Sequence, residues 1–222
     1  RMIEDGEAHS GDTALFIGTG ASGYASLLGR AGEGRIEGNS STGGAASIGP
    51  NRMSYLLDLH GPSEPIETAC SSALVAIHKA VQALRTGQTS LAVAGGINKL
   101  VLPEIQVAFS KAGMLCEDGR CKTFSKDANG YVRGEGAGML LLKRLSQAQA
   151  DGDHIYGLIR GSAQNHGGRA NSLTAPNPRA QAELIKSAFK QSGIAPETVS
   201  YIEAHGTGTP LGDPIEIQGL KS

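Results

Sequence analysis

The sequence predicts an α/β protein, because two short apolar strands flank a buried helix and a similar pattern begins again near the C-terminus. Residues 64–69 have the length and composition of a short strand, and residues 91–97 form a near-continuous apolar run. The helix between them extends to Gly87. A strand, a buried helix and an apolar strand in succession indicate a parallel sheet that helices cover.

The helix before Gly87 is predicted to be buried on several sides. Small residues recur along it at three- and four-residue spacing, namely Ala73, Ala76, Ala80 and Ala83. Larger apolar residues lie beside them, so little of the circumference is polar. Ser71 and Ser72 are N-cap residue types, and Gly87 is a natural C-terminal stop.

Cys70 lies at the start of this helix. The unpaired N–H groups and the dipole of a helix N-terminus stabilise negative charge. A thiolate is the nucleophilic form of cysteine, so Cys70 is a candidate for covalent catalysis. The local pattern fits a second interpretation equally well, in which Cys70 is a small buried hydrophobe.

Length and composition narrow the possibilities. The 222 residues suit one large domain or two small ones, and 20 basic and 21 acidic residues give a net charge of −1. Neither nucleic acid nor a membrane surface is indicated, and no apolar run approaches the length of a membrane span. Three cysteines give no disulfide framework and fit a reducing compartment, so we expect a cytoplasmic protein. Cys116 and Cys121 have no second pair, so no metal site is expected.

The elements that precede the central helix are a strand at residues 13–17 and a helix at residues 51–59. Residues 18–23 follow the first strand and formally match the dinucleotide fingerprint G-x-G-x-x-G. The following stretch is a poor helix, and no clear second strand ends in an acidic residue at the required distance. Turn glycines are the favoured interpretation, and a nucleotide-binding module is the alternative.

The elements that follow residue 100 complete the first pattern and start the second. A helix at residues 103–113 comes first, and then a long polar loop at residues 115–136. The remaining elements are a strand at 137–142, a helix at 145–150, a strand at 155–161, a loop at 164–178, a helix at 179–191 and a strand at 200–204. Long loops in compact domains are often functional.

His205 follows the last predicted strand and opens a glycine-threonine loop that ends at Thr209. Ligands of open α/β sheets gather outside the carboxyl ends of strands, where both Cys70 and His205 are expected. The loop is predicted to offer backbone N–H groups and the hydroxyls of Thr207 and Thr209 to a ligand. A cysteine paired with a distant histidine is a known nucleophile arrangement, although five other histidines compete for that role.

Three motifs resemble those of the β-ketoacyl synthase family of condensing enzymes. Residues 68–74 (Thr-Ala-Cys-Ser-Ser-Ala-Leu) resemble the nucleophile motif, and residues 205–216 (His-Gly-Thr-Gly-Thr-Pro-Leu-Gly-Asp-Pro-Ile-Glu) the histidine motif. Residues 127–136 resemble a third family block. The resemblance covers nearly the whole chain and is closest to ketosynthase domains of bacterial modular type I polyketide synthases. The lead-in at residues 61–65 is most similar to systems whose acyltransferase acts in trans.

The resemblance implies a thiolase-like fold, in which two similar α/β halves form a layered α-β-α-β-α stack. Residues 1–150 are then most of the N-terminal half, which carries the nucleophile. Residues 151–222 are the start of a truncated C-terminal half, which carries the first catalytic histidine. Both ends of the sequence look cut, so we expect this fragment alone to lack full condensing activity. The family also implies a homodimer, with the strand before the nucleophile near the interface.

The implied reaction is a decarboxylative Claisen condensation in polyketide biosynthesis, which makes the protein an acyltransferase. Cys70 takes an acyl chain from an acyl carrier protein, and a malonyl-type extender on a second carrier is decarboxylated and attacks it. His205 stabilises the enolate, Thr207 and Thr209 hydrogen-bond the phosphopantetheine arm, and the Cys70 N–H supplies one oxyanion donor. No cofactor is bound directly, because the phosphopantetheine arm serves as a substrate carrier. The partners are acyl carrier protein and other polyketide synthase domains.

Two features of the sequence leave the reaction open. The second histidine and the lysine of the family lie beyond Ser222, so a non-elongating ketosynthase that only binds and transfers acyl chains is the alternative function. The retained His205 favours elongation. Ser125 also stands where the family usually has an acidic residue, after Phe124.

Overall fold

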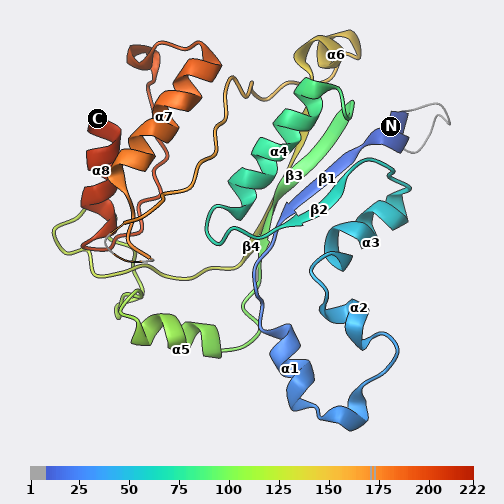
Figure 1. Ribbon diagram of the computed structural model, residues 1–222, viewed down its shortest axis with the longest axis vertical. Coiled ribbons are helices and arrows are strands. Elements are labelled where there is room, and N and C mark those ends of the chain that lie inside the picture. Colours follow the sequence, from blue (N-terminus) through green and yellow to red (C-terminus); the bar gives the residue numbers. More distant parts are fainter. Residues whose placement is uncertain (1–8, 171, 173) are drawn as a thin grey trace. The chain divides into compact units, whose positions relative to one another are not determined.

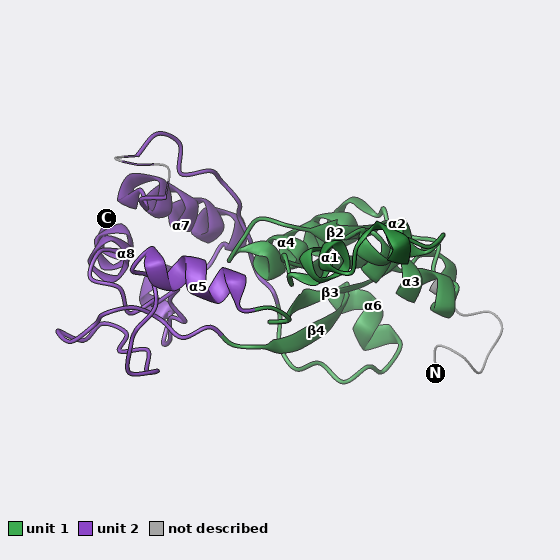
Figure 2. Cartoon of the chain, turned by 90° about the horizontal axis from the view of Figure 1, so that it is seen from below, with its two compact units in different colours: residues 1–102, 134–158 green, residues 103–133, 159–222 purple. Residues whose placement is uncertain are grey.

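The computed structural model describes residues 9–170, 172 and 174–222. Residues 1–8 of the predicted N-terminal half lie outside this range. The chain forms two compact units, shown in green and purple in Figure 2. The first comprises Arg1–Leu102 with Gly134–Leu158, and the second comprises Pro103–Arg133 with Ile159–Ser222. The division into synthase halves between residues 150 and 151 stays a prediction, and each unit is described by itself.

The first unit contains a four-stranded sheet with the order β2-β1-β3-β4 (Figure 1). The strands are β1 (Ala14–Gly18), β2 (Ser63–Ile66), β3 (Leu91–Asn98) and β4 (Gly136–Lys143). β2 and β3 both pair with β1 in parallel, and β4 pairs with β3 in antiparallel orientation. The predicted parallel strand–helix–strand unit is confirmed, with β1 between its two strands. The fourth strand makes the sheet mixed.

The helix α4 (Ser72–Thr86) packs against β1 and β3. Ala76 and Ala80 are fully buried on it, and their small side chains let the helix lie close to the alanine-rich strand β3. The core consists of Ala14, Phe16, Ile66, Ala76, Ala80, Ala83, Leu84, Ala92 and Ala94. The helix ends at Gly87, whose φ of 77° is left-handed, as the predicted glycine stop requires.

Among the described residues of the first unit, four further helices connect or flank the strands. They are α1 (Tyr24–Arg30), α2 (Ser40–Gly44), α3 (Ile48–Leu57) and α6 (Leu145–Ala150), with short 3-10 turns at His9–Asp12 and Glu33–Arg35. The helix α6 has the predicted bounds, and α3 begins three residues earlier than predicted. The helix α1 was not predicted, because glycines near it lower the helix propensity of its sequence.

The second unit contains α5 (Glu104–Lys111), α7 (Pro178–Ser192) and α8 (Gly212–Lys221), with a 3-10 turn at Pro196–Thr198. The side chain of Asn177 caps α7 by accepting hydrogen bonds from the N–H groups of Arg179 and Ala180. The helices α7 and α8 pack on each other at Gly219. A Cβ added to Gly219 would lie 2.9 Å from Oε1 of Gln181, so a larger residue here would require the Gln181 side chain to move.

Two predicted strands are wrong. Within the described residues, neither 155–161 nor 200–204 belongs to a strand. Tyr156 and Tyr201 are 96% and 75% exposed. Alternation of apolar residues is a local pattern, whereas a strand also needs a neighbouring backbone to pair with. No helix in the described part of the chain combines the length and hydropathy needed to cross a membrane.

Candidate active site

Cys70 lies in the turn that joins β2 to α4, two residues before the first residue of the helix. Its side chain is exposed, so the interpretation of Cys70 as a buried hydrophobe is wrong. The preceding Ala69 has a φ of 55°, which is left-handed and unfavourable for a residue with a Cβ. The chain therefore turns sharply at this point and presents the thiol at the N-terminal end of a 15-residue helix.

Two serine hydroxyls cross-link this turn. Oγ of Ser72 donates to the carbonyl of Ala69 at 2.7 Å and accepts the N–H of Thr68 at 2.9 Å. Oγ of Ser71 donates to the carbonyl of Thr68 at 2.9 Å. Ser71 holds the N-cap position, as its residue type predicted, but its side chain makes no capping hydrogen bond. The hydroxyls instead hold the strained turn before the helix.

Glycines let the start of α4 approach the carboxyl ends of two strands. A Cβ on Gly18 of β1 would lie 2.6 Å from the backbone nitrogen of Ala73, and a Cβ on Gly96 of β3 would lie 2.8 Å from its Cβ. Both distances are closer than van der Waals contact allows. Gly18, the first glycine of the formal nucleotide fingerprint, thus serves close packing beside the nucleophile turn, and Gly23 adopts a left-handed φ of 89°.

His205 lies in the second unit, in a loop held by carboxylates from α8. Oε1 of Glu216 accepts the backbone N–H of His205 at 2.6 Å, and Oε2 accepts that of Gly206 at 2.8 Å. Oδ1 of Asp213 accepts the N–H of Gly208 at 3.0 Å. The expectation that this loop offers its backbone N–H groups to a ligand is therefore wrong at these three positions. His205 itself is exposed.

The hydroxyls of Thr207 and Thr209 lie 2.9 Å apart and share one hydrogen bond. Oγ1 of Thr209 also accepts the N–H of Gly212, at the start of α8, at 3.0 Å. The two hydroxyls carry two hydrogens, and the bond between them uses one. Whichever residue is the donor, one hydroxyl hydrogen is left to bond a ligand.

The polar loop at residues 115–136 contacts the histidine loop within the second unit. Oγ1 of Thr123 donates to the carbonyl of Gly206 at 2.7 Å, and the N–H of Gly130 donates to that of Gly208 at 2.9 Å. The N–H of Phe124 donates to Oδ2 of Asp213 at 2.6 Å. Sequence reasoning missed the part that Asp213 plays. The available signal was an acidic residue in the first turn of a helix.

Ser125 makes the turn in which the family usually has an acidic residue. Its Oγ accepts the N–H of Asp127 at 3.2 Å, and its carbonyl accepts the N–H of Ala128 at 3.1 Å. Aspartate makes the same side-chain-to-backbone bond two residues on. A serine hydroxyl therefore fulfils the local structural role that the carboxylate can have.

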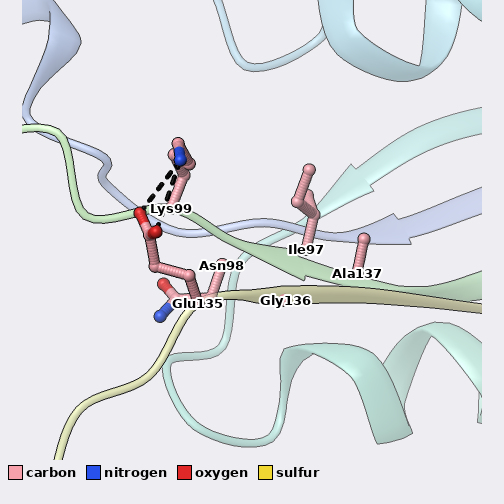
Figure 3. Close-up of a pocket in the computed structure, with 6 residues that line it drawn as sticks. All are labelled: Ile97, Asn98, Lys99, Glu135, Gly136 and Ala137. Carbon is pink, nitrogen blue, oxygen red and sulfur yellow. Dashed lines mark hydrogen bonds and ion pairs between the residues drawn. The ribbon is translucent and has the colours of Figure 1, made fainter.

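A separate groove of about 300 Å³ lies where β3 ends and β4 begins (Figure 3). It is lined by Ile97, Asn98, Lys99, Glu135, Gly136 and Ala137. Oε1 of Glu135 accepts the N–H of Leu100 at 2.7 Å and lies 3.2 Å from Nζ of Lys99. The Leu100 N–H and then the Lys99 ammonium hold the pKa of Glu135 below its usual value. The groove includes none of the predicted site residues. Its Glu135 contacts connect the residues before β4 to the residues after β3.

The structure places the predicted site residues in two groups. Cys70 belongs to the first unit, whereas His205, Thr207 and Thr209 belong to the second. Among the described residues, no group of three or more His, Cys, Asp or Glu side chains is arranged to hold a metal ion. Each group has a chemical capacity of its own: an exposed thiol at a helix N-terminus, and an exposed histidine in the same loop as the threonine hydroxyl pair.

Comparisons with known proteins agree with the motifs. Residues 2–148 match the family model described as Beta-ketoacyl synthase, N-terminal domain, and residues 156–222 match Beta-ketoacyl synthase, C-terminal domain. Polyketide synthase PksN of Bacillus subtilis is 60% identical over 210 residues, which are 95% of this chain and 4% of that protein. Polyketide synthase ThaG of Burkholderia thailandensis is 47% identical over 209 residues, which are 94% of this chain and 4% of that protein.

Solved ketosynthase structures share the fold. The ketosynthase from module 6 of the Bacillus subtilis bacillaene synthase has a TM-score of 0.87 and 42% identity, over 96% of this chain and 36% of that one. The Streptomyces albus oxazolomycin ketosynthase domain OzmH KS7 gives the same TM-score and identity over 95% of this chain and 36% of its own. The predicted thiolase-like fold is therefore confirmed. With both family models matched along its length, the chain belongs to the β-ketoacyl synthase family.

Proposed function

We propose that this chain carries the nucleophile and the first catalytic histidine of a ketosynthase in a bacterial modular polyketide synthase. The observation that carries the proposal is the exposed thiol of Cys70, presented by a strained turn at the N-terminal end of α4. The proposed reaction is that of the β-ketoacyl synthase family, to which the chain belongs. The chain spans about a third of the solved ketosynthases and a small part of the curated polyketide synthases, so the activity belongs to the larger protein.

The first step is transfer of the acyl chain. The Cys70 thiolate attacks the carbonyl of an acyl thioester on acyl carrier protein, the new C–S bond forms, and the phosphopantetheine thiol leaves. The N–H groups at the start of α4 and its dipole favour the thiolate that this step needs. The Cys70 N–H is one donor for the oxyanion that forms on the carbonyl.

The second step is condensation. A malonyl-type extender on a second carrier loses carbon dioxide, and the electron pair of the broken C–C bond becomes an enolate. His205 hydrogen-bonds the thioester oxygen on which the charge develops. The enolate carbon then attacks the acyl carbonyl on Cys70, forms a C–C bond and releases the Cys70 thiolate, which lengthens the chain by two carbons.

The phosphopantetheine arm is a substrate carrier and no cofactor is bound directly. The one hydroxyl hydrogen that Thr207 and Thr209 leave unshared supports a hydrogen bond to this arm. The proposed partners are acyl carrier protein and other polyketide synthase domains. A homodimer through the strand before the nucleophile is also proposed, and β2 suits it because it is an edge strand of the sheet.

The experiment that tests this function is peptide mapping by mass spectrometry after incubation with a small acyl thioester, in the complete ketosynthase domain that contains this sequence. Cys116 is half-buried and Cys121 is exposed, so both are internal controls. We expect acylation at Cys70 alone. Equal acylation of all three thiols, or normal acyl attachment after Cys70→Ala, would overturn the proposal. Release of carbon dioxide from malonyl carrier protein separates an elongating from a non-elongating ketosynthase.

A further inference from the structure

Asp213 is a buried carboxylate whose two oxygens bond two different loops. Asp213 lies in the first turn of α8 and is only 5% exposed. Oδ1 accepts the N–H of Gly208 at 3.0 Å, and Oδ2 accepts the N–H of Phe124 at 2.6 Å. Burial of a carboxylate costs free energy unless hydrogen bonds replace its contacts with water. These two hydrogen bonds therefore stabilise Asp213 in its buried position.

Both partners of Asp213 have left-handed backbone conformations, which are unfavourable for Phe124 and freely accessible to Gly208. Phe124 has a φ of 58° although it is not glycine, and Gly208 has a φ of 69°. A Cβ on Gly208 would lie 3.2 Å from both the carbonyl oxygen of Gly130 and the nitrogen of Lys122. The two loops are thus closely packed here, and the carboxylate fixes the N–H direction of each.

Gly208 stands between Thr207 and Thr209, so the direction of its peptide group sets the directions of the two side chains. Rotation of that peptide would separate hydroxyls that now lie 2.9 Å apart. A change at Asp213 therefore reaches the hydroxyls without any contact between the carboxylate and a ligand.

We propose that Asp213 is a positioning residue for the phosphopantetheine arm, which acts by holding Gly208 and with it the hydroxyls of Thr207 and Thr209. This inference rests on the proposed function, since it assumes that these hydroxyls bind the arm. It assigns Asp213 to recognition of the carrier arm and not to the reactivity of Cys70.

The test compares two acyl donors in the complete ketosynthase domain that contains this sequence. One donor is an acyl-pantetheine thioester, and the other is the S-phenyl thioester of the same acyl group, which has no arm. Acylation of Cys70 is followed by mass spectrometry for wild type and for Asp213→Asn. The amide has nearly the size of the carboxylate, but it offers one acceptor oxygen and turns an NH₂ group toward the second N–H.

We expect Asp213→Asn to raise the KM for the pantetheine donor about ten-fold or more, as loss of a hydrogen bond to a charged group does. The rate with the S-phenyl donor should stay within about two-fold, because that donor does not use the hydroxyls. The matched control is Asp118→Asn, which changes an exposed aspartate paired with Lys122 in the same unit and should behave as wild type with both donors.

Equal losses with both donors would show that Asp213 only stabilises the fold, and unchanged kinetics with both would show that it does not act on the arm. Either result overturns the inference while the proposed function stands. A wild-type protein that acylates Cys70 from neither donor overturns both. Asp213→Ser keeps an uncharged oxygen acceptor, and it gives the same comparison of donors where the amide variant does not fold.

Discussion

Glu216 holds the backbone of His205: its Oε1 accepts the His205 N–H at 2.6 Å, while its Oε2 accepts the N–H of Gly206 at 2.8 Å. Glu216 lies on the 10-residue helix α8, whereas His205 lies in a loop. A bidentate bond from a helix gives the loop a fixed direction at the point where the imidazole is attached. The position of the histidine therefore depends on a residue eleven positions later in the sequence.

Glu216→Gln should slow decarboxylation of malonyl carrier protein by about 10- to 100-fold, because one of two charge-assisted bonds is replaced by a facing NH₂ group. Acylation of Cys70 from an S-phenyl thioester should change by less than about two-fold. Carbon dioxide release and mass spectrometry measure the two steps. Glu183→Gln on the exposed face of α7 is the control, and equal loss of both steps in the Glu216 variant would contradict a role specific to His205.

Gly18→Ala should destabilise the protein by about 1–3 kcal/mol, because its Cβ would lie 2.6 Å from the backbone of α4. Gly20→Ala is the matched control, since no atom lies within 4 Å of its added Cβ. Urea unfolding of both variants measures the difference. Equal midpoints for the two variants would show that β1 and α4 do not meet as described.

Ala69→Gly should keep or raise stability, since a non-glycine residue at a φ of 55° costs about 1–2 kcal/mol. The same change at Ala80, in the interior of α4, should lower stability by about 1 kcal/mol or more, because glycine is a poor helix former. Thermal unfolding of the two variants gives opposite signs if the turn before Cys70 is strained. A loss of similar size at both positions would argue against that strain.

Glu135 should make the connection between the end of β3 and the start of β4, and with it the stability of the protein, sensitive to acid. The Leu100 N–H and the Lys99 ammonium lower its pKa in the folded state. Its stabilising effect is then complete above the unfolded glutamate pKa of about 4.3 and is lost as the pH falls through the lower folded value. The difference in unfolding midpoint between wild type and Glu135→Gln should therefore shrink between about pH 5 and about pH 3. Glu117→Gln, at an exposed position, is the control, and a constant difference for Glu135→Gln over this range would refute the prediction.

The elements that the sequence predicts correctly are those marked by a local pattern of residue types. The alanine spacing and the final Gly87 predict α4, and apolar runs predict β1 and β3. The segments at 155–161 and 200–204 carry a similar local signal but have no strand partner in the described part of the chain. Pairing is a property of two backbones, so one segment alone cannot specify it.

For this protein, the sequence by itself determined the family, the helix behind Cys70 and the residues that its motifs assign to the chemistry. These depend on residue types and spacings, which are readable along one chain. Only the tertiary structure decided that Cys70 is exposed and that Glu216 and Asp213 already occupy the N–H groups of the histidine loop. The reason is that a carboxylate accepts hydrogen bonds only from donors within about 3 Å. The N–H groups of this loop and the carboxylates of the later helix come that close only when the chain has folded.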